Sequence, residues 1–397
     1  MEGIVMASNA ARIKNDLKYL CSTQLQGRLS GSTGAKRAAT FLAGELEKYG
    51  FIPAGKEGYF ESVSVPAARL LGEATLSIGK WNLLHRIEFG ELAYYGGGSG
   101  EGRLVVLKEG SEYDESVLEG SFVLLRGDTT DMDLKETVRS ANQMGVKAIL
   151  MDGGEPRWFH KSVMGDYRTT EQNIPVIKIR TSLLSEIEAL EGQMVKLNLP
   201  IETGIMECQN VMGYLPGQDA EGKTIAFATH YDFLGDDPSG FRFEGAGDNA
   251  AGVATMLELA RKLSEQRLPL NILIVFTTGE ESNLWGEKHF VSNPPLQLDQ
   301  TIYLDALGRS PYYSLNLVYD ESERYSFAEA FTSQCYKDGI KTNITSNQKH
   351  LFDLLITGTS GVKFRPYHTP DDTWKLIHVE VLEEVANALY SSCKRIK

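Results

Sequence analysis

The sequence predicts an α/β protein built on a mostly parallel sheet flanked by helices, with a smaller β-rich unit inserted into it. The chain has 397 residues, more than one hydrophobic core usually serves. After residue 200, apolar runs such as Thr224–Thr229 and Asn271–Phe276 alternate with helical periodicity, as in Ala251–Gln266. Short β-like runs dominate the middle of the chain instead. We therefore predict an N-terminal part of the larger domain, an insert and the main part of the larger domain at residues 1–70, 71–200 and 201–397.

The N-terminal part begins with an amphipathic stretch over Ala11–Cys21, followed by the glycine-rich turn QGRLSGSTG. In that turn, Ser32 or Thr33 is placed to cap the next helix. The apolar stripe predicts a helix over Ala35–Tyr49, and Gly50 is a suitable residue to end it.

The middle and the end of the chain follow different patterns. In the insert, the runs ATLSI, RLVVL and SFVLLRG predict strands, and a helix through Val138–Met144 leads to a further strand, VKAILMD. Beyond the run at Asn271–Phe276, strands ending in YLDALGR and LNLVYD precede a helix from about Ser322 to Lys337. A last helix runs through Val379–Leu389. Alternation of this kind is typical of a largely parallel sheet covered by helices.

Charge and composition exclude some classes of partner. Lys and Arg number 40 against 53 Asp and Glu, a net charge of -13, which disfavours nucleic acid and anionic membranes. The first residues lack the pattern of a secretory signal, so we expect a cytoplasmic protein, although a secreted mature form stays open. The composition does not address the oligomeric state. The four cysteines are scattered, which predicts buried free thiols: Cys21, Cys208, Cys335 and Cys393.

Candidate metal ligands fall at successive strand ends or in the loops that follow them. They are His230, Asp248, Glu281, Asp305 and His368. In α/β sheets, the carboxyl ends of the strands are where sites are usually built. Two imidazoles and three carboxylates without a cysteine are typical of a catalytic metal site rather than a structural one. A carboxylate has two oxygens, so one aspartate can bridge two cations about 3.5–4 Å apart.

The adjacent residues Glu280 and Glu281 are predicted to have different roles in the site. Neighbouring residues at the end of a strand cannot both point at one metal without strain, so one binds while the other acts. If Glu281 is the ligand, Glu280 is free to take a proton from the attacking water and return it to the leaving amine. An adjacent glutamate pair alone is usually a solvated surface feature. The apolar run NILIVFTT, which leads directly into this pair, favours the site.

Similar weighing applies to two of the predicted ligands, Asp305 and His368, and to Asp232. Asp305 ends an apolar run, where a buried carboxylate needs a partner, and a cation would be one. Asp232 follows His230 by two residues and would point the same way, so it can accept the second N–H of that histidine. His368 precedes Thr-Pro-Asp-Asp and, taken alone, is more readily a plain turn histidine than a ligand.

Other features receive structural interpretations. His85 and His160 have no carboxylate or cysteine companions in a ligand spacing, so we expect surface or hydrogen-bonded structural histidines. The pair Asp236–Asp237 is expected to be solvated. Residues 245–250 fit the dinucleotide pattern G-x-G-x-x-A, but no apolar strand precedes them directly. Asp248 would also place negative charge where a pyrophosphate must bind.

Taken together, five ordered motifs resemble metallopeptidase family 28, the two-zinc aminopeptidases, in its variety with an inserted protease-associated (PA) domain. The motifs are HYDFLG, GAGDNAAG, GEESNLWG, YLDALGR and YHTPDDTW. The N-terminal QGRLSGSTGAKRAATFLAGELEKYGF also resembles the segment that opens this family's catalytic domain. The resemblance implies a three-layer αβα catalytic domain of the zinc-exopeptidase (phosphorylase/hydrolase-like) kind, with residues 71–200 as the β-rich PA domain.

The resemblance also implies roles for individual residues. His230 and Glu281 would hold one zinc ion, Asp305 and His368 a second, and Asp248 would bridge both. Glu280 would be the general base, and Asp232 would be the partner of His230. Tyr367 matches a position where relatives use tyrosine to polarise the scissile carbonyl or to stabilise its oxyanion.

Two motifs depart from the family pattern. Many members have Asp-Asp-Asn in the bridging loop, where this chain has Gly247-Asp248-Asn249. The usual Ser-Asp-His element is SNQKHLFD here, which leaves the shape of the substrate pocket open. His350, in that element, is either a substrate-side residue or a surface histidine.

The resulting prediction is a zinc-dependent exopeptidase with two zinc ions per chain. It is most simply an aminopeptidase that hydrolyses N-terminal residues from peptides by two-metal, Glu280-assisted attack of water. Other activities on the same scaffold, such as carboxypeptidase, dipeptidase or glutaminyl cyclase, stay open, as does a non-catalytic binding relative. The complete ligand set and the presence of Glu280 favour hydrolysis.

Overall fold

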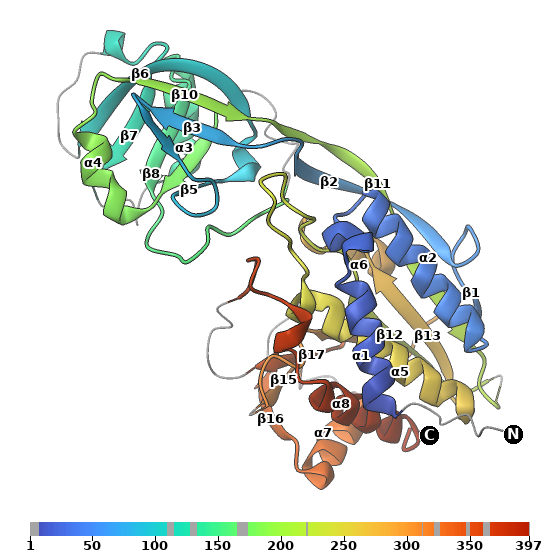
Figure 1. Cartoon of the computed structure of the whole chain (residues 1–397). Helices are drawn as coiled ribbons and strands as arrows, with labels where there is room; N and C mark the ends of the chain where they lie inside the picture. The colour runs from blue at the N-terminus through green and yellow to red at the C-terminus, as the bar shows by residue number, and fades with distance from the viewer. Residues whose placement is uncertain are drawn as a thin grey trace, which may run out of the picture. The chain divides into compact units, whose positions relative to one another are not determined.

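The computed structural model describes residues 8–108, 115–127, 133–164, 174–219, 221–311, 313–320, 326–346, 350–359 and 366–396. Parts of three predicted features lie outside this description: residues 1–7 of the chain start, the beginning of the predicted helix at Ser322, and residues 347–349 of SNQKHLFD. The chain forms two compact units (Figure 1). The large unit comprises residues 1–65, 206–236 and 242–397, and the inserted unit comprises residues 66–205 and 237–241.

A nine-stranded sheet is the centre of the large unit within the described residues, in the order β1-β11-β13-β12-β14-β17-β15-β16 with β2 paired to β11. Its strands are β1 (Ile52–Pro53), β2 (Phe60–Leu70), β11 (Ile201–Leu215), β12 (Thr224–His230), β13 (Asn271–Thr277), β14 (Gln300–Asp305), β15 (Ser314–Tyr319), β16 (Lys341–Ser346) and β17 (Leu354–Thr359). The central block β13-β12-β14-β17 is parallel, while β11 and β15 join it in antiparallel pairs. Parallel neighbours bring the carboxyl ends of β13, β12 and β14 to one edge.

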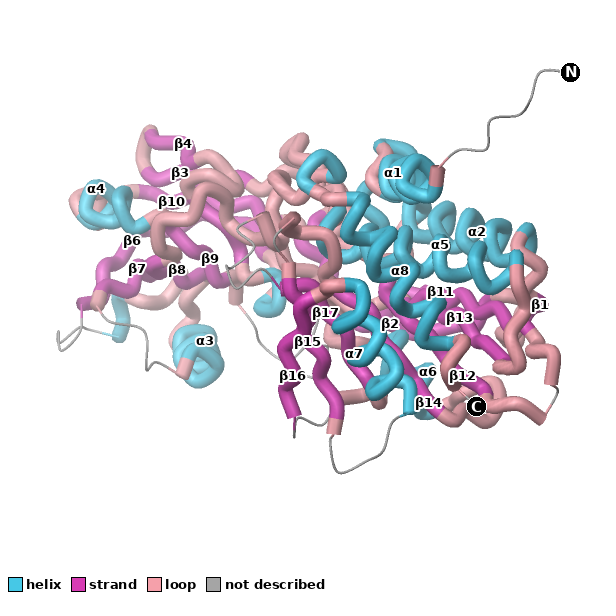
Figure 2. The backbone as a smooth tube through the Cα atoms, turned by 90° about the horizontal axis from the view of Figure 1, so that it is seen from below, coloured by secondary structure: helices cyan, strands magenta, loops and turns pink. Residues whose placement is uncertain are grey.

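Helices cover both faces of this sheet (Figure 2). One face carries α1 (Asn9–Leu20), α2 (Thr33–Lys48), α5 (Ala251–Glu265), α7 (Ser326–Asp338) and α8 (Val379–Cys393), and the other carries α6 (Trp285–Ser292). Alternate residues of β12 divide between the two cores: Ile225 and Phe227 join the core under the first group, and Ala226 and Ala228 join the core that contains Phe290 of α6. A strand buried on both faces has a continuous apolar sequence, which explains TIAFAT. The predicted α/β fold class is confirmed.

Helix α2 begins where the sequence predicted a cap. The Ser32 side chain accepts a hydrogen bond from the backbone N–H of Ala35 at 3.1 Å. The buried stripe of the helix includes Leu42 and Leu46, and Gly50 follows the helix with a φ of 75°. The turn that precedes α2 therefore fixes where the helix starts, and its position matters for the site because the same turn carries Arg28.

The inserted unit has its own sheet, in the order β4-β3-β10-β6-β7-β8-β9-β5 among the described strands. These are β3 (Thr75–Ile78), β4 (Trp81–Leu83), β5 (Phe89–Glu91), β6 (Gly98–Lys108), β7 (Phe122–Arg126), β8 (Ala148–Asp152), β9 (Val176–Ile179) and β10 (Met194–Leu199), with helices α3 (Leu134–Gln143) and α4 (Leu184–Glu188). Two separate apolar clusters form its core. The unit is rich in strands as expected, and its identity as a PA domain stays a prediction.

The chain passes between the two units within β2 and β11, which pair with each other, and again on either side of residues 237–241. The predicted limits of the insert, residues 71–200, did not include residues 237–241. These residues lie between His230 and Asp248 in the sequence.

The cysteines bear on one further expectation. Cys21, Cys208, Cys335 and Cys393 are free and buried, as predicted. Among the helices that the structure describes, none combines the length and apolar character needed to cross a membrane.

Two glycines of α2 provide a matched test of packing around the turn. A Cβ at Gly34 would lie 2.0 Å from the carbonyl oxygen of Leu25, whereas a Cβ at Gly44 would meet no described heavy atom within 4 Å. We expect Gly34→Ala to lower the free energy of unfolding by about 1–3 kcal/mol, because the backbone must shift. Gly44→Ala should raise it by up to about 1 kcal/mol through helix propensity. Urea unfolding of both variants tests this, and equal effects would contradict it.

Candidate metal centre

Predicted ligands from five segments of the chain meet at the carboxyl edge of the central sheet. His230 is the last residue of β12 and Asp305 the last residue of β14. Glu281 lies in the turn after β13, and Asp248 lies in the segment Ala246–Ala250 that leads into α5. His368 comes from a turn before α8 and has a φ of 55°. Residues scattered over 139 positions of sequence therefore converge through strand order.

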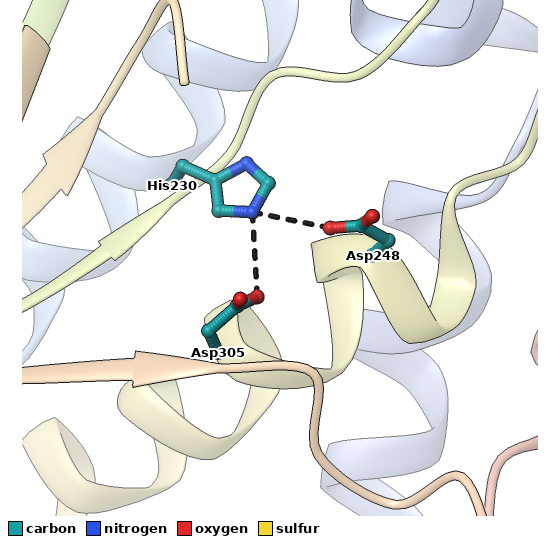
Figure 3. Close-up of side chains that lie close together, drawn as sticks. All are labelled: His230, Asp248 and Asp305. Carbon is teal, nitrogen blue, oxygen red and sulfur yellow. Dashed lines mark ion pairs between the residues drawn. The ribbon is translucent and has the colours of Figure 1, made fainter. Parts of the chain in front are cut away.

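One group of side chains consists of His230, Asp248 and Asp305 (Figure 3). Nε2 of His230 lies 3.3 Å from Oδ1 of Asp248 and 3.5 Å from Oδ1 of Asp305. The three side chains point toward one another from β12, the segment before α5 and β14. Their ligand atoms all lie within 4.8 Å of one another, so one cation can reach all three.

A second group consists of Asp248, Glu281 and His368. Nε2 of His368 lies 3.0 Å from Oε2 of Glu281 and 3.5 Å from Oδ2 of Asp248. Asp248 thus contributes Oδ1 to the first group and Oδ2 to the second. This is the arrangement that a bridging carboxylate requires. A third combination within the same range joins His230 to Glu280 and Glu281.

The predicted partition of ligands differs from this geometry. The sequence analysis paired His230 with Glu281 and Asp305 with His368, whereas the shortest contacts pair His230 with Asp305 and Glu281 with His368. The cause is strand order. Strand β14 pairs directly with β12, so the residues that end these strands are neighbours. The order of residues in the sequence does not contain that information.

Unsatisfied polar atoms test whether these residues fit a metal. Within the described part of the chain, both ring nitrogens of His230, Nε2 of His368, Oε1 of Glu281 and Oδ1 of Asp305 are buried and make no hydrogen bond. Such atoms are costly unless a partner is supplied. Nitrogen and carboxylate oxygen are also the donors that divalent zinc accepts. The residues therefore fit a metal centre.

The charges of the group are strongly coupled. Burial lowers the pKa of His230, but the surrounding carboxylates, Glu280 first among them, raise it well above its usual value. Burial raises the pKa of Glu281 to about 7 and raises that of Glu280 well above its usual value. Burial would raise the pKa of Asp248 as well, yet His230 and His368 lower it. The cluster therefore concentrates buried carboxylates whose negative charge divalent cations would neutralise.

Asp232 lies where the sequence analysis placed it, behind His230. Its Oδ1 is 3.7 Å from Nδ1 of His230 and accepts the backbone N–H of Glu280 at 3.3 Å. Its Oδ2 accepts the hydroxyl of Ser30 at 2.9 Å, and that hydroxyl also accepts the N–H of Gly279. Asp232 thus links β12, the Glu280 turn and the N-terminal turn, and its predicted role as the partner of His230 is compatible with this position.

Arg28 is a residue that the sequence analysis missed. Its fully buried guanidinium donates to the backbone carbonyls of Leu20, Tyr231, Glu244 and Gly245 at 2.5–2.9 Å. Three of these carbonyls belong to the loop that joins His230 to Asp248. The five-donor fork of arginine can hold several carbonyls in fixed directions. Arg28 therefore ties both ends of the ligand-bearing loop to the N-terminal turn.

Asp372, also missed, holds the bridging segment from the other side. Its carboxylate accepts the backbone N–H of Gly247 at 2.8 Å and that of Asp248 at 3.2 Å. Burial raises the pKa of Asp372 to about 7. Arg309 donates to the carbonyl of Gly247 at 3.1 Å, and its Nη2 lies 3.8 Å from Oδ2 of Asp248. The sequence signal was only that Asp372 belongs to the final histidine motif.

These contacts also decide against the dinucleotide pattern at residues 245–250. The amides of Gly247 and Asp248 are already bound by the Asp372 carboxylate, so they are not directed at a phosphate. Strand β12 ends at His230, well before Gly245. The segment carries the predicted ligand Asp248 and does not have the geometry of a phosphate loop.

Tyr367 is the most exposed of the predicted site residues. It is 42% exposed, and its ring stacks on that of His368 with centroids 3.7 Å apart. The guanidinium of Arg309 lies 5.9 Å from the Tyr367 ring. Burial of the phenol raises its pKa, and so do the carboxylates of the site, so the hydroxyl stays protonated as a donor. Its catalytic role stays a prediction.

The remaining histidines lie outside the two groups. His350 is partly buried, burial lowers its pKa, and its Nδ1 accepts the backbone N–H of Phe352. His85 belongs to the inserted unit and is a hydrogen-bonded structural histidine, paired with Glu91. His160 is exposed in the same unit, and its carbonyl accepts from Arg86.

Comparison with known proteins identifies the relatives of this site. Residues 210–392, which contain all five predicted ligands, match the model of peptidase family M28. This segment belongs to peptidase family M28. The chain is 26% identical over 300 residues to aminopeptidase YwaD of Bacillus subtilis, an alignment that covers 69% of this chain and 63% of that protein. It is 28% identical over 182 residues to a vacuolar membrane protease of Schizosaccharomyces japonicus, covering 42% of this chain and 20% of the relative. The chain thus spans less than two thirds of the length of either curated relative.

Solved structures share the fold of this chain. The crystal structure of BSAP, a zinc aminopeptidase from Bacillus subtilis, superposes with a TM-score of 0.73 at 20% identity. The match covers 98% of this chain and 95% of that one. A structure of a peptidase M28 precursor from Shewanella amazonensis gives a TM-score of 0.68 at 18% identity, covering 96% and 91% of the two chains.

Replacing Asp372 tests its role in placing the bridging aspartate. Asp372→Asn keeps the shape of the side chain but turns one acceptor into a donor that faces a backbone N–H. We expect metal affinity to fall by about 10–100-fold, as is typical for residues that orient ligands. Asp338→Asn removes the same charge from the exposed end of α7 and should leave the affinity unchanged. Titration calorimetry with zinc measures both, and equal affinities for the two variants would contradict the assignment.

Proposed function

We propose that this chain is a zinc-dependent exopeptidase, and specifically an aminopeptidase with two zinc ions per chain. The observation that carries the proposal is the pair of ligand groups that share Asp248, together with their unpartnered nitrogen and oxygen atoms. Membership of a peptidase family and the printed activities of its relatives support the reaction class. The substrate would be a peptide.

The donor set supports zinc in particular. His230, Asp248 and Asp305 would hold one ion, and Asp248, Glu281 and His368 the other. Each group has one imidazole and two carboxylates, and no cysteine takes part. Bound zinc would act as a Lewis acid toward the peptide carbonyl and make water a stronger nucleophile.

Glu280 is the residue best placed to move the proton. It neighbours the ligand Glu281, and its ligand atom lies within reach of His230 and Glu281 without belonging to either of the two Asp248 groups. As general base, it would take the proton of the attacking water and deliver it to the departing amine, so that the peptide gives an acid and an amine. Asp232 would orient the His230 ring, and the Tyr367 hydroxyl would donate to the oxygen that gains charge.

The central test replaces Glu280 by Gln in the full-length chain. Loss of the base should lower kcat by about 10²–10⁴-fold while the zinc content stays unchanged. Glu287→Gln is a matched control, because Glu287 is a buried glutamate on α6 that lies outside the ligand groups. Full activity of Glu280→Gln, or purified wild type that binds no zinc, would contradict the mechanism.

Substrate choice is tested separately with a panel of aminoacyl chromogenic amides, in free and N-acetylated form. An aminopeptidase should cleave the free amides and spare the acetylated ones. Cleavage of blocked peptides alone, release of C-terminal residues, or cyclisation of N-terminal glutamine without hydrolysis would each replace the aminopeptidase assignment by another activity.

A further inference from the structure

The sequence analysis expected Asp236 and Asp237 to be solvated, which is wrong for Asp237: it is only 4% exposed. Residues 237–241 belong to the inserted unit, although the rest of the segment between β12 and α5 belongs to the large unit. In the inserted unit, Oδ2 of Asp237 lies 3.0 Å from the guanidinium of Arg86. The same short turn brings Ser239 to a buried group of charged side chains.

His85 of the inserted unit lies between a carboxylate and a hydroxyl. Its Nε2 is 2.8 Å from Oε2 of Glu91, and its Nδ1 is 2.8 Å from the hydroxyl oxygen of Ser239. The side chains of His85 and Glu91 are 4% and 2% exposed, whereas Ser239 is partly exposed. We call Ser239, His85 and Glu91 the insert triad. Its pairing of His85 with Glu91 leaves the second ring nitrogen for Ser239.

A tight turn between β4 and β5 places His85. The N–H of Arg86 donates to the carbonyl of Phe89 at 2.8 Å, and Arg86 has a φ of 66°. The turn folds His85 back beside Phe89, so that their ring centroids lie 5.1 Å apart. Glu91 follows two residues later, at the end of β5. The imidazole is thus held by the connection between its own strands, independently of Ser239.

Ser239 is held by a turn that is closed on itself. The N–H of Asp237 donates to the carbonyl of Phe241 at 2.8 Å, and the N–H of Gly240 donates to the carbonyl of Asp237 at 2.9 Å. Oδ1 of Asp237 accepts the N–H of Ser239 at 2.9 Å. Gly240, directly after Ser239, has a φ of 91°, which favours glycine. The backbone therefore fixes the position from which the Ser239 hydroxyl projects.

Glu91 determines which nitrogen of His85 carries a proton. Burial alone would raise the pKa of Glu91, but the charge of Arg86 and the hydrogen bond with His85 lower it to about 2. An ionised carboxylate only accepts hydrogen bonds, so Nε2 of His85 donates to it. In the neutral ring, Nδ1 is then an acceptor, and the Ser239 hydroxyl donates to it. Arg86 binds the second oxygen of Glu91 at 2.6 Å and holds this arrangement in place.

A pocket of about 550 Å³ opens at the insert triad, entirely within the inserted unit. Ser239 and His85 both line it, so the hydroxyl and the ring that accepts its proton border the same space. This volume is in the range of small-molecule sites. The lining also includes leucine side chains and exposed N–H donors: Leu76, Leu83, Leu84, Asn82 and Lys196.

We propose that Ser239 is a nucleophile that takes the acyl group of a small carboxylic ester, with His85 as its general base. Oγ of Ser239 attacks the ester carbonyl while the hydroxyl proton moves to Nδ1 of His85. The bond between the acyl carbon and the alcohol oxygen breaks, and His85 gives the proton to the departing alcohol, which leaves an acyl-serine. Attack of water on the acyl-serine, with the same proton transfers, releases the carboxylic acid and restores Ser239.

The geometry of the insert triad fits this step. A nucleophile and its base need to lie about 2.6–3.2 Å apart, with a third group to orient the base. Both hydrogen bonds of His85 are 2.8 Å. The imidazolium that forms would lie between Glu91 and Asp237, whose Oδ1 is 3.8 Å from Nδ1, and their negative charges would stabilise it.

The insert triad differs from the usual serine triad in one respect, because the two ring nitrogens exchange partners. Each nitrogen still faces the group that the reaction requires: a carboxylate on one side and the hydroxyl on the other. All three residues and the pocket belong to the inserted unit. The proposal is therefore independent of the metal centre and of the proposed peptidase function.

The first test treats the full-length protein with a fluorophosphonate and, separately, with p-nitrophenyl acetate, and maps the modified peptides by mass spectrometry over time. Ser185, exposed on α4, is an internal control with the same functional group. We expect both reagents to modify Ser239 about 100-fold faster than Ser185, because general-base assistance has about this effect. Equal rates at the two serines, or no modification of Ser239, would overturn the proposal.

The second test concerns the base. His85→Gln should lower the rate of Ser239 modification by about 100-fold. Because His85 is buried, its replacement can also unfold the insert, so Ser239→Cys supplies a measurement in which His85 is kept. The native cysteines are buried, and the introduced thiol should react with iodoacetamide in mildly acidic buffer about tenfold faster than that of Ser185→Cys, since proton transfer to His85 gives a thiolate. Equal rates for these two variants would show that the bond to His85 only fixes the turn, and would overturn the proposal.

Discussion

The burial of charged ligands at the carboxyl edge of the sheet is the constraint on which the rest of the site depends. His230 is 0% exposed, and Asp248 and Glu281 are 5% and 7% exposed, yet several of their polar atoms have no hydrogen-bond partner among the described residues. An unpaired carboxylate in such surroundings costs several kcal/mol, so the group is stable only with protons or cations in its midst. Residues around it are accordingly fixed by hydrogen bonds to the backbone: Arg28 binds four carbonyls, and Asp372 binds two amides.

One loop brings these constraints together. It leaves β12 at His230, passes Asp232, runs through residues 237–241, which belong to the inserted unit, and returns to Asp248 before α5. The N–H groups of Gly235 and Asp236 in this loop donate to the carbonyls of Gly27 and Gln26, so the turn that precedes α2 helps to hold the predicted ligands in place.

The local sequence pattern predicted the strands and the helix start that depend on interactions between residues close together in the chain. Continuous apolar runs predicted β12 and β13 because both faces of these strands are buried, and the cap at Ser32 marked the start of α2. Ligand type predicted which residues converge. The pairing of ligands was not predictable, because it depends on β14 lying beside β12. The burial of Asp237 was equally hidden, since its partner Arg86 lies 151 residues away. Arg28 binds backbone carbonyls, and Asp372 binds backbone amides. Such groups are nearly the same in every residue type, so the sequence does not show which of them a side chain will bind.

The central claim is that two cations share Asp248. Anomalous X-ray scattering at the zinc edge, from crystals of the full-length protein grown with zinc, measures this directly. The account predicts two peaks about 3.5–4 Å apart. Each peak should lie about 2.0–2.2 Å from one oxygen of Asp248, one beside His230 and Asp305 and the other beside Glu281 and His368. A single peak, or two peaks that do not share Asp248, would contradict it.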